Sequence, residues 1–397
     1  MRSVKKIAIL GSTGSIGTST LSICEQFPDR YLPVALAAGT NTEAAFEQAQ
    51  RWRPRLLSLA TERHAETVRS MLKTAGIHGI EVLSGTAGTI AVATLPDVEF
   101  VVSAIVGVAG LEATYAAILA GKTIGLANKE CLVAAGDLII AAARANKVAL
   151  LPIDSEHNAV HQCMRGGSAK EVAQVWLTAS GGPFRNTAAE KFAHITPAQA
   201  LKHPTWVMGQ RITIDSATMM NKGFEVIEAC RLFDLPPDKV RVTVHPQSTV
   251  HSFVEFIDGS ILAQISVTDM RLPILYALAF PERPASTLTF DLAQLSQLDF
   301  APPDLVRFPC LRLAYEAAAA GPSACIALNA ADEVAVAAFL SGQIPFLGIP
   351  RTIERVLELT PSTRPESISE VLDADRAARA TAEQVVSEAA VSAQPIA

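Results

Sequence analysis

The sequence predicts an α/β protein in which an N-terminal doubly wound parallel sheet precedes an α+β region with a mixed sheet and a C-terminal helical bundle. Three observations carry this prediction. Short apolar runs alternate with longer amphipathic ones up to about residue 152. Two β-rich segments then flank an Asp-Gly turn, and the chain after residue 311 becomes rich in alanine at helical spacing. The corresponding domain boundaries are 1–152, 153–280 and 312–397, with a linker at 281–311.

The first domain is predicted from six strand-like runs of mainly aliphatic residues, each followed by a longer segment with helical periodicity. The predicted strands are 6–10, 32–38, 56–60, 100–103, 123–127 and 148–152. The predicted helices are 21–26, 43–51, 62–74, 111–120 and 132–146.

The second domain is predicted from segments 249–256 and 261–266, which flank Asp258-Gly259 and read as an antiparallel hairpin on a mixed sheet. An apolar outer face of such a sheet would suit a homodimer interface. Five prolines between 281 and 311 predict a surface linker. The predicted bundle helices are 311–320, 327–340, 353–359 and 373–390.

Composition excludes several classes of protein. The chain has 397 residues, 49% of them hydrophobic, which is enough for two or three packed domains. With 33 basic and 39 acidic residues the net charge is -6, so no overall field attracts nucleic acid or an anionic membrane. Any phosphate that the chain binds must therefore meet a local site. The apolar stretch 138–151 is short and contains Arg144 and Lys147, so we expect no transmembrane helix.

Six cysteines show no C-x-x-C pair and no spacing typical of a zinc site or a disulfide framework. Reduced thiols in the cytoplasm are the simplest interpretation. The first strand-like run begins about five residues after Met1, so we expect no leader peptide.

A glycine-rich turn follows the first predicted strand. Gly11, Gly14 and Gly17 are spaced G-x-x-G-x-x-G rather than the standard G-x-G-x-x-G. A tight strand-to-helix turn alone would also select glycine. Its place in a βα alternation nevertheless favours a Rossmann-like dinucleotide site, where backbone amides at a helix N-terminus bind phosphate.

Cofactor choice is expected at the end of the second strand, where NAD-binding folds place an acidic residue for the ribose 2′-hydroxyl. Residues 37–41 read Ala-Ala-Gly-Thr-Asn and contain no carboxylate. Small polar groups there tolerate a 2′-phosphate, which favours NADP over NAD. Glu43 is the nearest acidic residue.

Carboxylates suggest a divalent-cation site. Asp154 and Glu156 lie two residues apart after the last strand of the first domain, so in extended chain both face one point. Hard oxygen ligands suit Mg²⁺ or Mn²⁺, although a D-x-E sequence alone is more often a solvated loop or helix start. A third ligand is plausible in the predicted helix 219–233, where Asn221, Glu225 and Glu228 share a face. A solvated helix edge is the alternative there.

A phosphate pocket is predicted from the turn at 179–183 (Ala-Ser-Gly-Gly-Pro), whose amides could form an anion-binding nest, together with Ser216, Asn221 and Lys222. A plain turn is the alternative for 179–183. The segment 203–209 carries Trp206 between proline and glycine and is a candidate lid, although a tryptophan that anchors its loop is commoner. Four histidines are expected to be structural, or to support the ligands from behind, rather than to bind a metal themselves; they are His157, His161, His245 and His251.

These motifs together resemble one enzyme family, the 1-deoxy-D-xylulose 5-phosphate reductoisomerases, over nearly the whole chain. The resemblance lies in seven separated segments, which are 11–17 (GSTGSIG), 127–130 (ANKE), 151–158 (LPIDSEHN), 180–185 (SGGPFR), 203–209 (HPTWVMG), 215–223 (DSATMMNKG) and 245–248 (HPQS). It implies reduction and isomerisation of 1-deoxy-D-xylulose 5-phosphate to 2-C-methyl-D-erythritol 4-phosphate in non-mevalonate isoprenoid synthesis, with NADPH and Mg²⁺ or Mn²⁺.

The resemblance also implies roles for individual residues. Asp154, Glu156 and Glu225 would be the metal ligands in the catalytic domain, with Lys129 and Ser155 touching the substrate. The implied phosphate-binding residues are Ser180, Ser216, Asn221 and Lys222. His203 and Trp206 would lie on a loop that closes over the substrate, His203 as a catalytic residue. The implied cofactor-binding residues are Thr13, Gly14, Ser15, Ile16, Gly39, Thr40, Asn41, Asn128, Glu130 and Gly209.

Two positions depart from the family pattern, and two other functions remain open. Cys131 stands where serine commonly follows the Asn-Lys-Glu motif, and Thr40 stands where some members carry lysine. Another NADP-dependent dehydrogenase, such as a semialdehyde dehydrogenase with a cysteine nucleophile, would need Cys131. A non-catalytic nucleotide sensor would bind NADPH without turnover.

Overall fold

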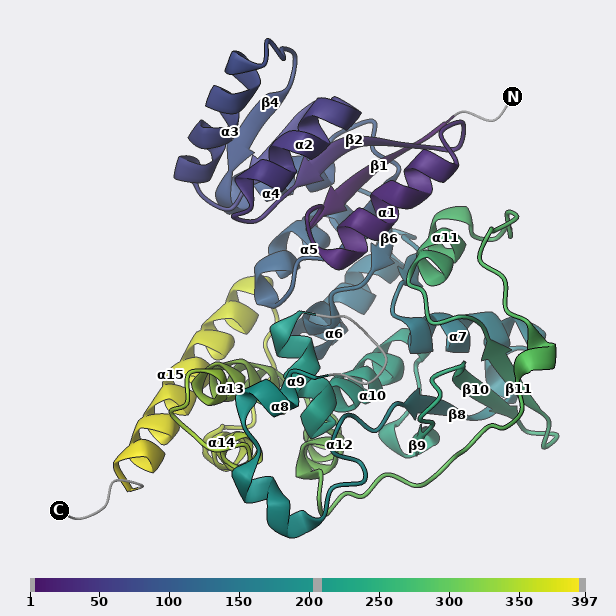
Figure 1. Ribbon diagram of the computed structural model, residues 1–397, viewed down its shortest axis with the longest axis vertical. Coiled ribbons are helices and arrows are strands. Elements are labelled where there is room, and N and C mark those ends of the chain that lie inside the picture. The colour runs from purple at the N-terminus through teal and green to yellow at the C-terminus, as the bar shows by residue number, and fades with distance from the viewer. Residues whose placement is uncertain (1–3, 203–208, 393–397) are drawn as a thin grey trace. The chain divides into compact units, whose positions relative to one another are not determined.

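The computed structural model describes residues 4–202 and 209–392 (Figure 1). Its internal contacts divide the chain into two compact units, which are described separately below. The first comprises Met1–Cys131, Ile139–Asn158 and Asp269–Leu288, and the second comprises Leu132–Leu138, Ala159–Thr268 and Thr289–Ala397.

The first unit is built on a seven-stranded sheet in the order β4-β3-β2-β1-β5-β6-β7, with every strand pair parallel. The chain adds strands on one side of β1 and then returns to add β5, β6 and β7 on the other, which is the doubly wound topology that the sequence predicts. The strands are β1 (Lys5–Leu10), β2 (Tyr31–Ala37), β3 (Leu56–Leu59), β4 (Glu81–Ser84), β5 (Phe100–Ser103), β6 (Thr123–Leu126) and β7 (Leu150–Pro152).

All six predicted strands are present, but the structure adds β4 and the helix that follows it. β4 forms one end of the sheet, and only Val82 of its four residues is fully buried. An edge strand of this length lacks the apolar run that identifies a buried strand, so the sequence pattern gives no signal for it.

Helices connect the parallel strands, as right-handed βαβ units require. They are α1 (Ser15–Gln26), α2 (Thr42–Trp52), α3 (Glu62–Thr74), α4 (Gly85–Thr94), α5 (Leu111–Leu119) and α6 (Lys129–Ala145). The non-helical backbone of Ala135 kinks α6.

The predicted boundary at residue 280 differs from the observed division, because α11 (Arg271–Ala279) packs in the first unit. Ile274 and Leu278 share a core with Ile7 and Ile9 of β1. The Lys5 ammonium also donates a hydrogen bond to the carbonyl of Leu278 over 2.7 Å. An apolar helix distant in sequence therefore completes the first core, and no local pattern reveals where such a helix docks.

The turn between β1 and α1 requires glycine at two positions. Gly11 has a φ of 87°, and a Cβ on it would lie 2.6 Å from the carbonyl oxygen of Ala104. A Cβ on Gly17 would lie 2.3 Å from the carbonyl oxygen of Gly11. The start of α1 therefore lies directly against the turn, an approach that only glycine permits.

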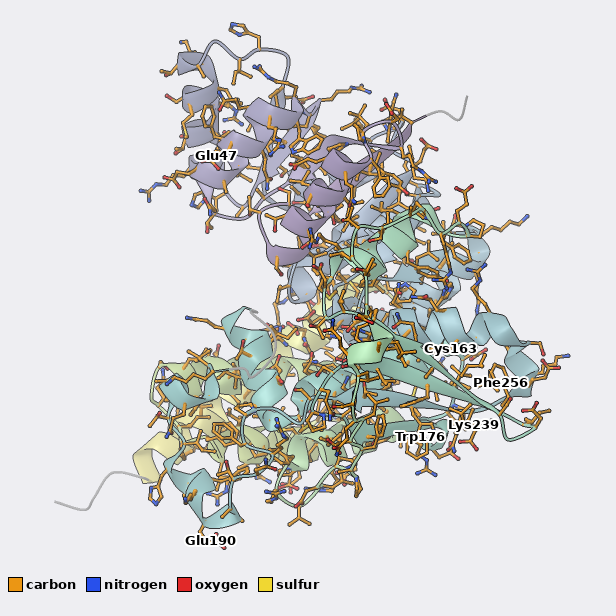
Figure 2. The ribbon with its side chains drawn as sticks, turned by 45° about the vertical axis from the view of Figure 1, so that its right-hand side comes forward. Glu47, Cys163, Trp176, Glu190, Lys239 and Phe256 are labelled. Carbon is orange, nitrogen blue, oxygen red and sulfur yellow. The ribbon has the colours of Figure 1, made fainter. Side chains whose placement is uncertain are left out.

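The second unit contains a four-stranded mixed sheet in the order β11-β10-β8-β9, with β8 parallel to β9 and antiparallel to β10. The strands are β8 (Val172–Ala179), β9 (Val240–Val244), β10 (Val250–Phe256) and β11 (Ile261–Ile265). β10 and β11 form the predicted antiparallel hairpin, and Gly259 in its turn has a φ of 84°. Cys163 and Phe256, both labelled in Figure 2, belong to the core of this unit.

Helices complete the second unit. They are α7 (Ser155–Cys163), which begins in the first unit, α8 (Pro197–Ala200), α9 (Gln210–Thr218), α10 (Met220–Phe233), α12 (Pro309–Ala320), α13 (Pro322–Leu340), α14 (Gly348–Leu359) and α15 (Ile368–Ser392). Short 3-10 helices occur at Val108–Gly110, Met164–Gly166, Ala169–Glu171, Ala189–His194, Pro237–Lys239 and Leu292–Gln294. The helical C-terminal region is confirmed. Its helices share one core with β8 and α10, so it does not separate from the predicted middle domain.

Among the described residues, α13 alone is long and apolar enough to cross a membrane by length and composition. Within the protein, 72% of its apolar window is buried. α13 packs against α12, α14 and α15, so most of its apolar residues lie in the core of the second unit.

The predicted linker contains no long helix or strand, but His245 ties part of it to the sheet. The ring Nδ1 donates to the carbonyl of Asp299 over 2.9 Å, while Nε2 accepts the backbone N–H groups of Thr249 and Val250 over 3.2 Å each. Phe300 stacks on the same ring. A neutral imidazole satisfies all three bonds, which agrees with the predicted structural role.

Charged side chains are buried between α9, α13 and α15. Asp332 of α13 is fully buried, with an oxygen 3.6 Å from the Arg211 guanidinium of α9. Burial raises the pKa of Asp332 to about 6, and the nearby Arg211 opposes that rise only in part. Glu333 and Asp215 add negative charge to the same cluster.

Replacing Gly17 by Ala is expected to lower the free energy of unfolding by about 1–3 kcal/mol, because the new Cβ would overlap the backbone of Gly11 and Ser12. Gly39→Ala is the matched control, since a Cβ there meets no atom within 4 Å. Urea unfolding measures both. Equal stability of the two variants would contradict the close approach.

Asp332→Asn is expected to stabilise the protein relative to the wild type increasingly as the pH rises. The pKa of Asp332 is higher in the folded state than in the unfolded chain, so its protonated form stabilises the fold. This contribution to the free energy of unfolding is lost as the pH rises through about 6. Urea unfolding at about pH 5 and about pH 8 measures the difference. Asp238→Asn, at an exposed carboxylate, is the control. A stability difference that does not change with pH would contradict the burial argument.

Candidate active site

Asp154 and Glu156 lie at the start of α7, directly after β7. The carboxylate of Asp154 accepts the backbone N–H of Glu156 over 3.3 Å, and its carbonyl accepts the N–H of Asn158 over 2.9 Å. Asp154 therefore caps the helix, a position that favours negative charge. The sequence predicted an extended segment here. The two carboxylates lie close together instead because Asp154 caps α7 and Glu156 lies in the first turn of the same helix.

Lys129, the first residue of α6, contacts Asp154. Its ammonium is largely buried and donates a hydrogen bond to the Asp154 carboxylate. Ser155 donates its hydroxyl hydrogen to the Glu156 carboxylate. Two of the residues with implied substrate roles therefore lie beside the implied metal ligands.

Glu225 lies on α10 and is 99% buried. One of its oxygens accepts the Asn221 amide over 2.6 Å, and the other accepts the ammonium of the buried Lys222. Asn221 is one helical turn from Glu225, so both side chains project from the same face of α10. Asn221 and Lys222, which the family resemblance implies to bind phosphate, thus contact the carboxylate of Glu225, an implied metal ligand.

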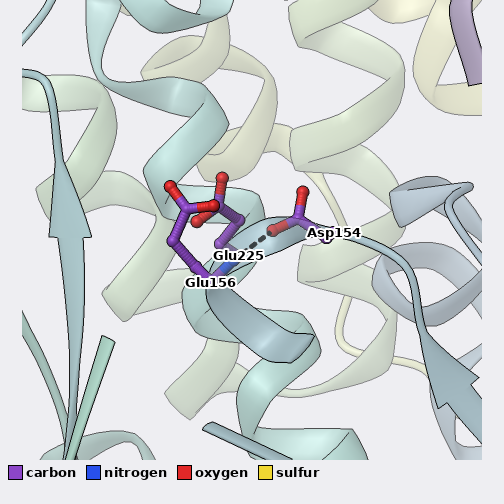
Figure 3. A group of neighbouring side chains, drawn as sticks. All are labelled: Asp154, Glu156 and Glu225. Atoms are coloured by element: carbon purple, nitrogen blue, oxygen red, sulfur yellow. Dashed lines mark hydrogen bonds between the residues drawn. The ribbon is translucent and has the colours of Figure 1, made fainter. Parts of the chain in front are cut away.

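The three implied metal ligands come together. Asp154, Glu156 and Glu225 each offer a carboxylate oxygen, and these oxygens lie within 4.8 Å of one another (Figure 3). Farther along α7, Val160 and Cys163 pack in the same core as Phe224 and Ile227 of α10.

The donor set fits a divalent cation. Oxygens around one Mg²⁺ lie at about 2.1 Å from it, so opposite ligands are about 4.2 Å apart. Adjacent ligands around the same ion are about 3 Å apart. The three observed oxygens lie within 4.8 Å of one another, so they would move closer together on binding one ion. Lys129 and Lys222 supply two of the positive charges that keep three carboxylates together in partly buried surroundings.

Gly223 explains why α10 lies where it does. A Cβ on Gly223 would lie 2.5 Å from the Cβ of Ala314 on α12. Glycine inside a helix costs stability relative to alanine, and here it permits the close approach of a helix of the C-terminal region. A larger residue would push α10, and Glu225 with it, away from α12.

The predicted phosphate turn lies against the end of α9. Gly181 and Gly182 have φ values of 79° and 67°, and the Ser180 hydroxyl accepts the N–H of Gly182 over 3.2 Å. A Cβ on Gly182 would lie 2.6 Å from the carbonyl oxygen of Ser216. The structure thus brings Ser180 and Ser216 into one neighbourhood.

Two predicted site residues, His203 and Trp206, lie outside the described residues. Gly209 is described and is the N-cap residue of α9. Its carbonyl accepts the backbone N–H and the hydroxyl of Thr213, so its position is fixed by the first turn of that helix.

The implied cofactor residues Thr13, Gly14, Ser15 and Ile16 lie at the start of α1. Gly14 is the N-cap residue and offers no side chain to the first amides of this twelve-residue helix. Amides in such a position suit an anionic ligand.

The end of β2 carries no acidic residue. Gly39 and Thr40 are exposed, and the Asn41 side chain caps α2 by accepting the N–H of Ala44 over 3.0 Å. Glu43 is exposed in the first turn of α2. The arrangement leaves room and small polar groups where a 2′-phosphate would lie.

Asn128 has a clear structural task. Its side-chain oxygen accepts the N–H of Cys131, and its amide donates to the carbonyls of Ile105 and Gly107. It therefore joins the start of α6 to the loop after β5. Glu130 and Cys131 are both buried in the first turn of α6.

Sequence reasoning missed Arg211. This residue lies on α9 between Gly209 and Ser216 and reaches α13, where Glu333 accepts its guanidinium over 2.8 Å. The only local signal is a possible pair with Asp215 at helical i,i+4 spacing. The acids on α13 are more than a hundred residues away in sequence.

Comparison with known proteins identifies the chain's relatives. The family models for 1-deoxy-D-xylulose 5-phosphate reductoisomerase and its C-terminal domain match residues 7–136 and 150–233, and the model for the DXP reductoisomerase C-terminal domain matches 265–381. A reductoisomerase of Solibacter usitatus is 50% identical, covering 96% of this chain and 97% of its own. That of Methylococcus capsulatus is 51% identical, covering 96% and 99%.

Solved structures agree. A reductoisomerase crystallised with NADPH, fosmidomycin and magnesium matches with a TM-score of 0.90 at 41% identity, covering 97% of this chain and 98% of the other. The enzyme of Zymomonas mobilis in complex with NADPH matches with a TM-score of 0.90 at 43% identity, covering 96% and 99%. The chain belongs to the 1-deoxy-D-xylulose 5-phosphate reductoisomerase family.

Proposed function

We propose that this protein converts 1-deoxy-D-xylulose 5-phosphate to 2-C-methyl-D-erythritol 4-phosphate with NADPH and a divalent cation. The observation that carries the proposal is the gathering of Asp154, Glu156 and Glu225 within 4.8 Å, in a chain of this family. Related structures contain NADPH and magnesium. The product is an intermediate of non-mevalonate isoprenoid synthesis.

A bound Mg²⁺ or Mn²⁺ supplies a Lewis acid and a template for the ketose carbonyl and its neighbouring hydroxyl. Asp154, Glu156 and Glu225 would hold it. Lys129, whose ammonium already lies at Asp154, is placed to stabilise negative charge that develops on a substrate oxygen. Ser155, beside Glu156, is the proposed hydrogen-bonding partner of the substrate.

Substrate phosphate is proposed to bind the donors of α9, α10 and the 180–182 turn. Ser180 and Ser216 offer hydroxyl groups, and Lys222 offers charge. Because Lys222 and Asn221 also bind Glu225, phosphate and metal would share one set of side chains. Such a link fixes the reacting carbons by means of the distant phosphate. His203 and Trp206 remain predicted contacts of a closing loop that excludes water.

The cofactor is proposed to bind at the glycine turn, with its pyrophosphate at the start of α1. The uncapped amides after Gly14 fit a phosphate, and the end of β2 carries no carboxylate that would repel a 2′-phosphate. Gly39, Thr40, Asn41 and Glu130 are the further proposed contacts. Asn128 would act by holding the adjoining loop.

The cysteine-dependent dehydrogenase is less well supported. Cys131 is fully buried and its N–H is bound to Asn128, a setting that does not present a nucleophilic sulfur to a substrate. Chelation should therefore abolish turnover, and thiol alkylation should not. The six cysteines carry thiols rather than disulfides, and five of them are buried. Free thiols are consistent with the reducing cytoplasm, where we place the protein.

A homodimer is proposed from β11. This strand lies at the edge of the mixed sheet, and Ile261 and Ile265 project exposed apolar side chains from one of its faces. An exposed apolar edge strand usually pairs or is covered, and a second copy would cover it symmetrically.

Glu225→Gln is expected to lower metal-dependent turnover of 1-deoxy-D-xylulose 5-phosphate by about a hundredfold or more, because it removes one anionic ligand. NADPH binding should be retained. Loss of NADPH absorbance, followed with and without Mg²⁺, measures turnover, and fluorescence titration measures NADPH binding. Glu316→Gln, at an exposed residue of α12, is the control. Unimpaired turnover of Glu225→Gln would remove Glu225 from the ligand set.

Replacing Ile261 and Ile265 together by Asp is expected to convert a dimer to a monomer, because two charges would be buried in the proposed interface. Sedimentation equilibrium measures the mass. Leu292→Asp, at another exposed apolar residue, should leave the mass unchanged. A monomeric wild type, or a double variant of dimeric mass, would contradict the proposal.

A further inference from the structure

Arg211 lies at a junction of elements that the proposed reaction uses. It is the second residue of α9, two positions after Gly209 and five before Ser216. Its side chain is four-fifths buried, so its contacts are with protein groups more than with solvent. An arginine so placed needs anionic or polar partners, because desolvating an unpaired guanidinium is costly.

α13 supplies most of these partners. The guanidinium donates to Glu333 over 2.8 Å and to the Asn329 side chain over 3.1 Å, and it lies 3.6 Å from Asp332. Asn329 also donates to Glu333 over 3.3 Å. The acceptors are thus held relative to one another, and the planar fork of arginine matches such a set better than the point charge of lysine does.

Two further contacts join Arg211 to the proposed site. Its guanidinium lies 5.8 Å from the ring centre of Phe224, which precedes Glu225 on α10. It also lies 3.7 Å from Asp215, which precedes Ser216 on α9. One side chain therefore contacts the neighbours of a proposed metal ligand and of a proposed phosphate ligand.

The contacts continue to the C-terminal helix. The second oxygen of Glu333 accepts the Arg379 guanidinium of α15 over 2.6 Å, and Arg379 also binds Asp375 over 2.6 Å. Glu333 is bound by two guanidinium groups and has little freedom to follow any movement of α9. The anchor for Arg211 is accordingly the packed bundle of α13 and α15, which together make an extensive interface.

We propose that Arg211 is a positioning residue that fixes the corner between α9 and α10 against α13 and so sets the positions of Ser216 and Glu225. The proposal rests on the proposed function, since those two residues matter only if they bind phosphate and metal. Arg211 touches neither ligand in this account. The corner needs such a support because Met219, where α9 turns into α10, has a left-handed backbone with a φ of 65°.

The test compares Arg211→Met and Arg211→Lys with the wild type. Arg211→Met is expected to weaken Mn²⁺ binding and to raise the KM for 1-deoxy-D-xylulose 5-phosphate by about tenfold or more, as loss of a support behind a ligand typically does. The Mn²⁺ affinity and the substrate KM of Arg211→Lys should lie between those of the wild type and Arg211→Met, because lysine keeps the charge but lacks the planar guanidinium.

Two controls separate positioning from general damage. Arg312→Met removes an arginine of α12 that pairs with Glu316 and Glu354 on the surface, and it should change none of these constants. Arg379→Met leaves Arg211 in place but frees Glu333, so a smaller change in the same direction is expected. Thermal unfolding identifies any variant that fails to fold, in which case Arg211→Lys and Arg379→Met carry the test.

Mn²⁺ binding, measured calorimetrically without substrate or NADPH, separates this proposal from the proposed function. A wild type that binds Mn²⁺ but does not turn over 1-deoxy-D-xylulose 5-phosphate would overturn the function, and the Mn²⁺ affinities of the variants would still test Arg211. Unchanged Mn²⁺ affinity and substrate KM in Arg211→Met would overturn the positioning role. So would an equal loss of Mn²⁺ affinity in Arg312→Met, which would show that the effect is not specific to Arg211.

Discussion

The repulsion among three carboxylates is the constraint on which the rest of the site depends. Asp154, Glu156 and Glu225 can lie within 4.8 Å only if positive charge compensates them. The chain supplies part of that charge from Lys129 and Lys222, each beside one carboxylate, and the cap position of Asp154 at α7 supplies more. A divalent cation would complete the compensation, which is why the arrangement suits metal chemistry rather than a purely structural salt bridge.

Close backbone approach fixes several of the elements that carry the proposed metal, phosphate and cofactor ligands. Gly223 lets α10 lie against α12, Gly182 lets the 180–182 turn lie against α9, and Gly17 lets α1 start directly at the turn after β1. In each case a methyl group would meet a neighbouring atom at 2.6 Å or less. The positions of the proposed ligands therefore depend on helices and turns that leave no room for an added carbon.

Much of the fold could be predicted from sequence because its strands are buried on both faces. The strands of the first unit that lie inside the sheet are mainly aliphatic, as at residues 7–10 and 100–102, and the turn residues Asp258-Gly259 mark the hairpin. β4 could not be recognised, since an exposed edge strand needs no apolar run. The docking of α11 in the first unit depends on Ile274 and Leu278 meeting β1, and nothing local in the sequence records such a contact.

The site was predictable to a similar degree and for similar reasons. Residue spacing and family motifs pointed to Asp154, Glu156 and Glu225, although the first two are joined by a helix cap rather than by an extended strand. Arg211 was missed because its partners lie on α13. The most direct measurement is a crystal structure grown with Mn²⁺, read by anomalous scattering. The account predicts one strong peak coordinated by all three carboxylates, and a peak bound elsewhere, or none, would contradict it.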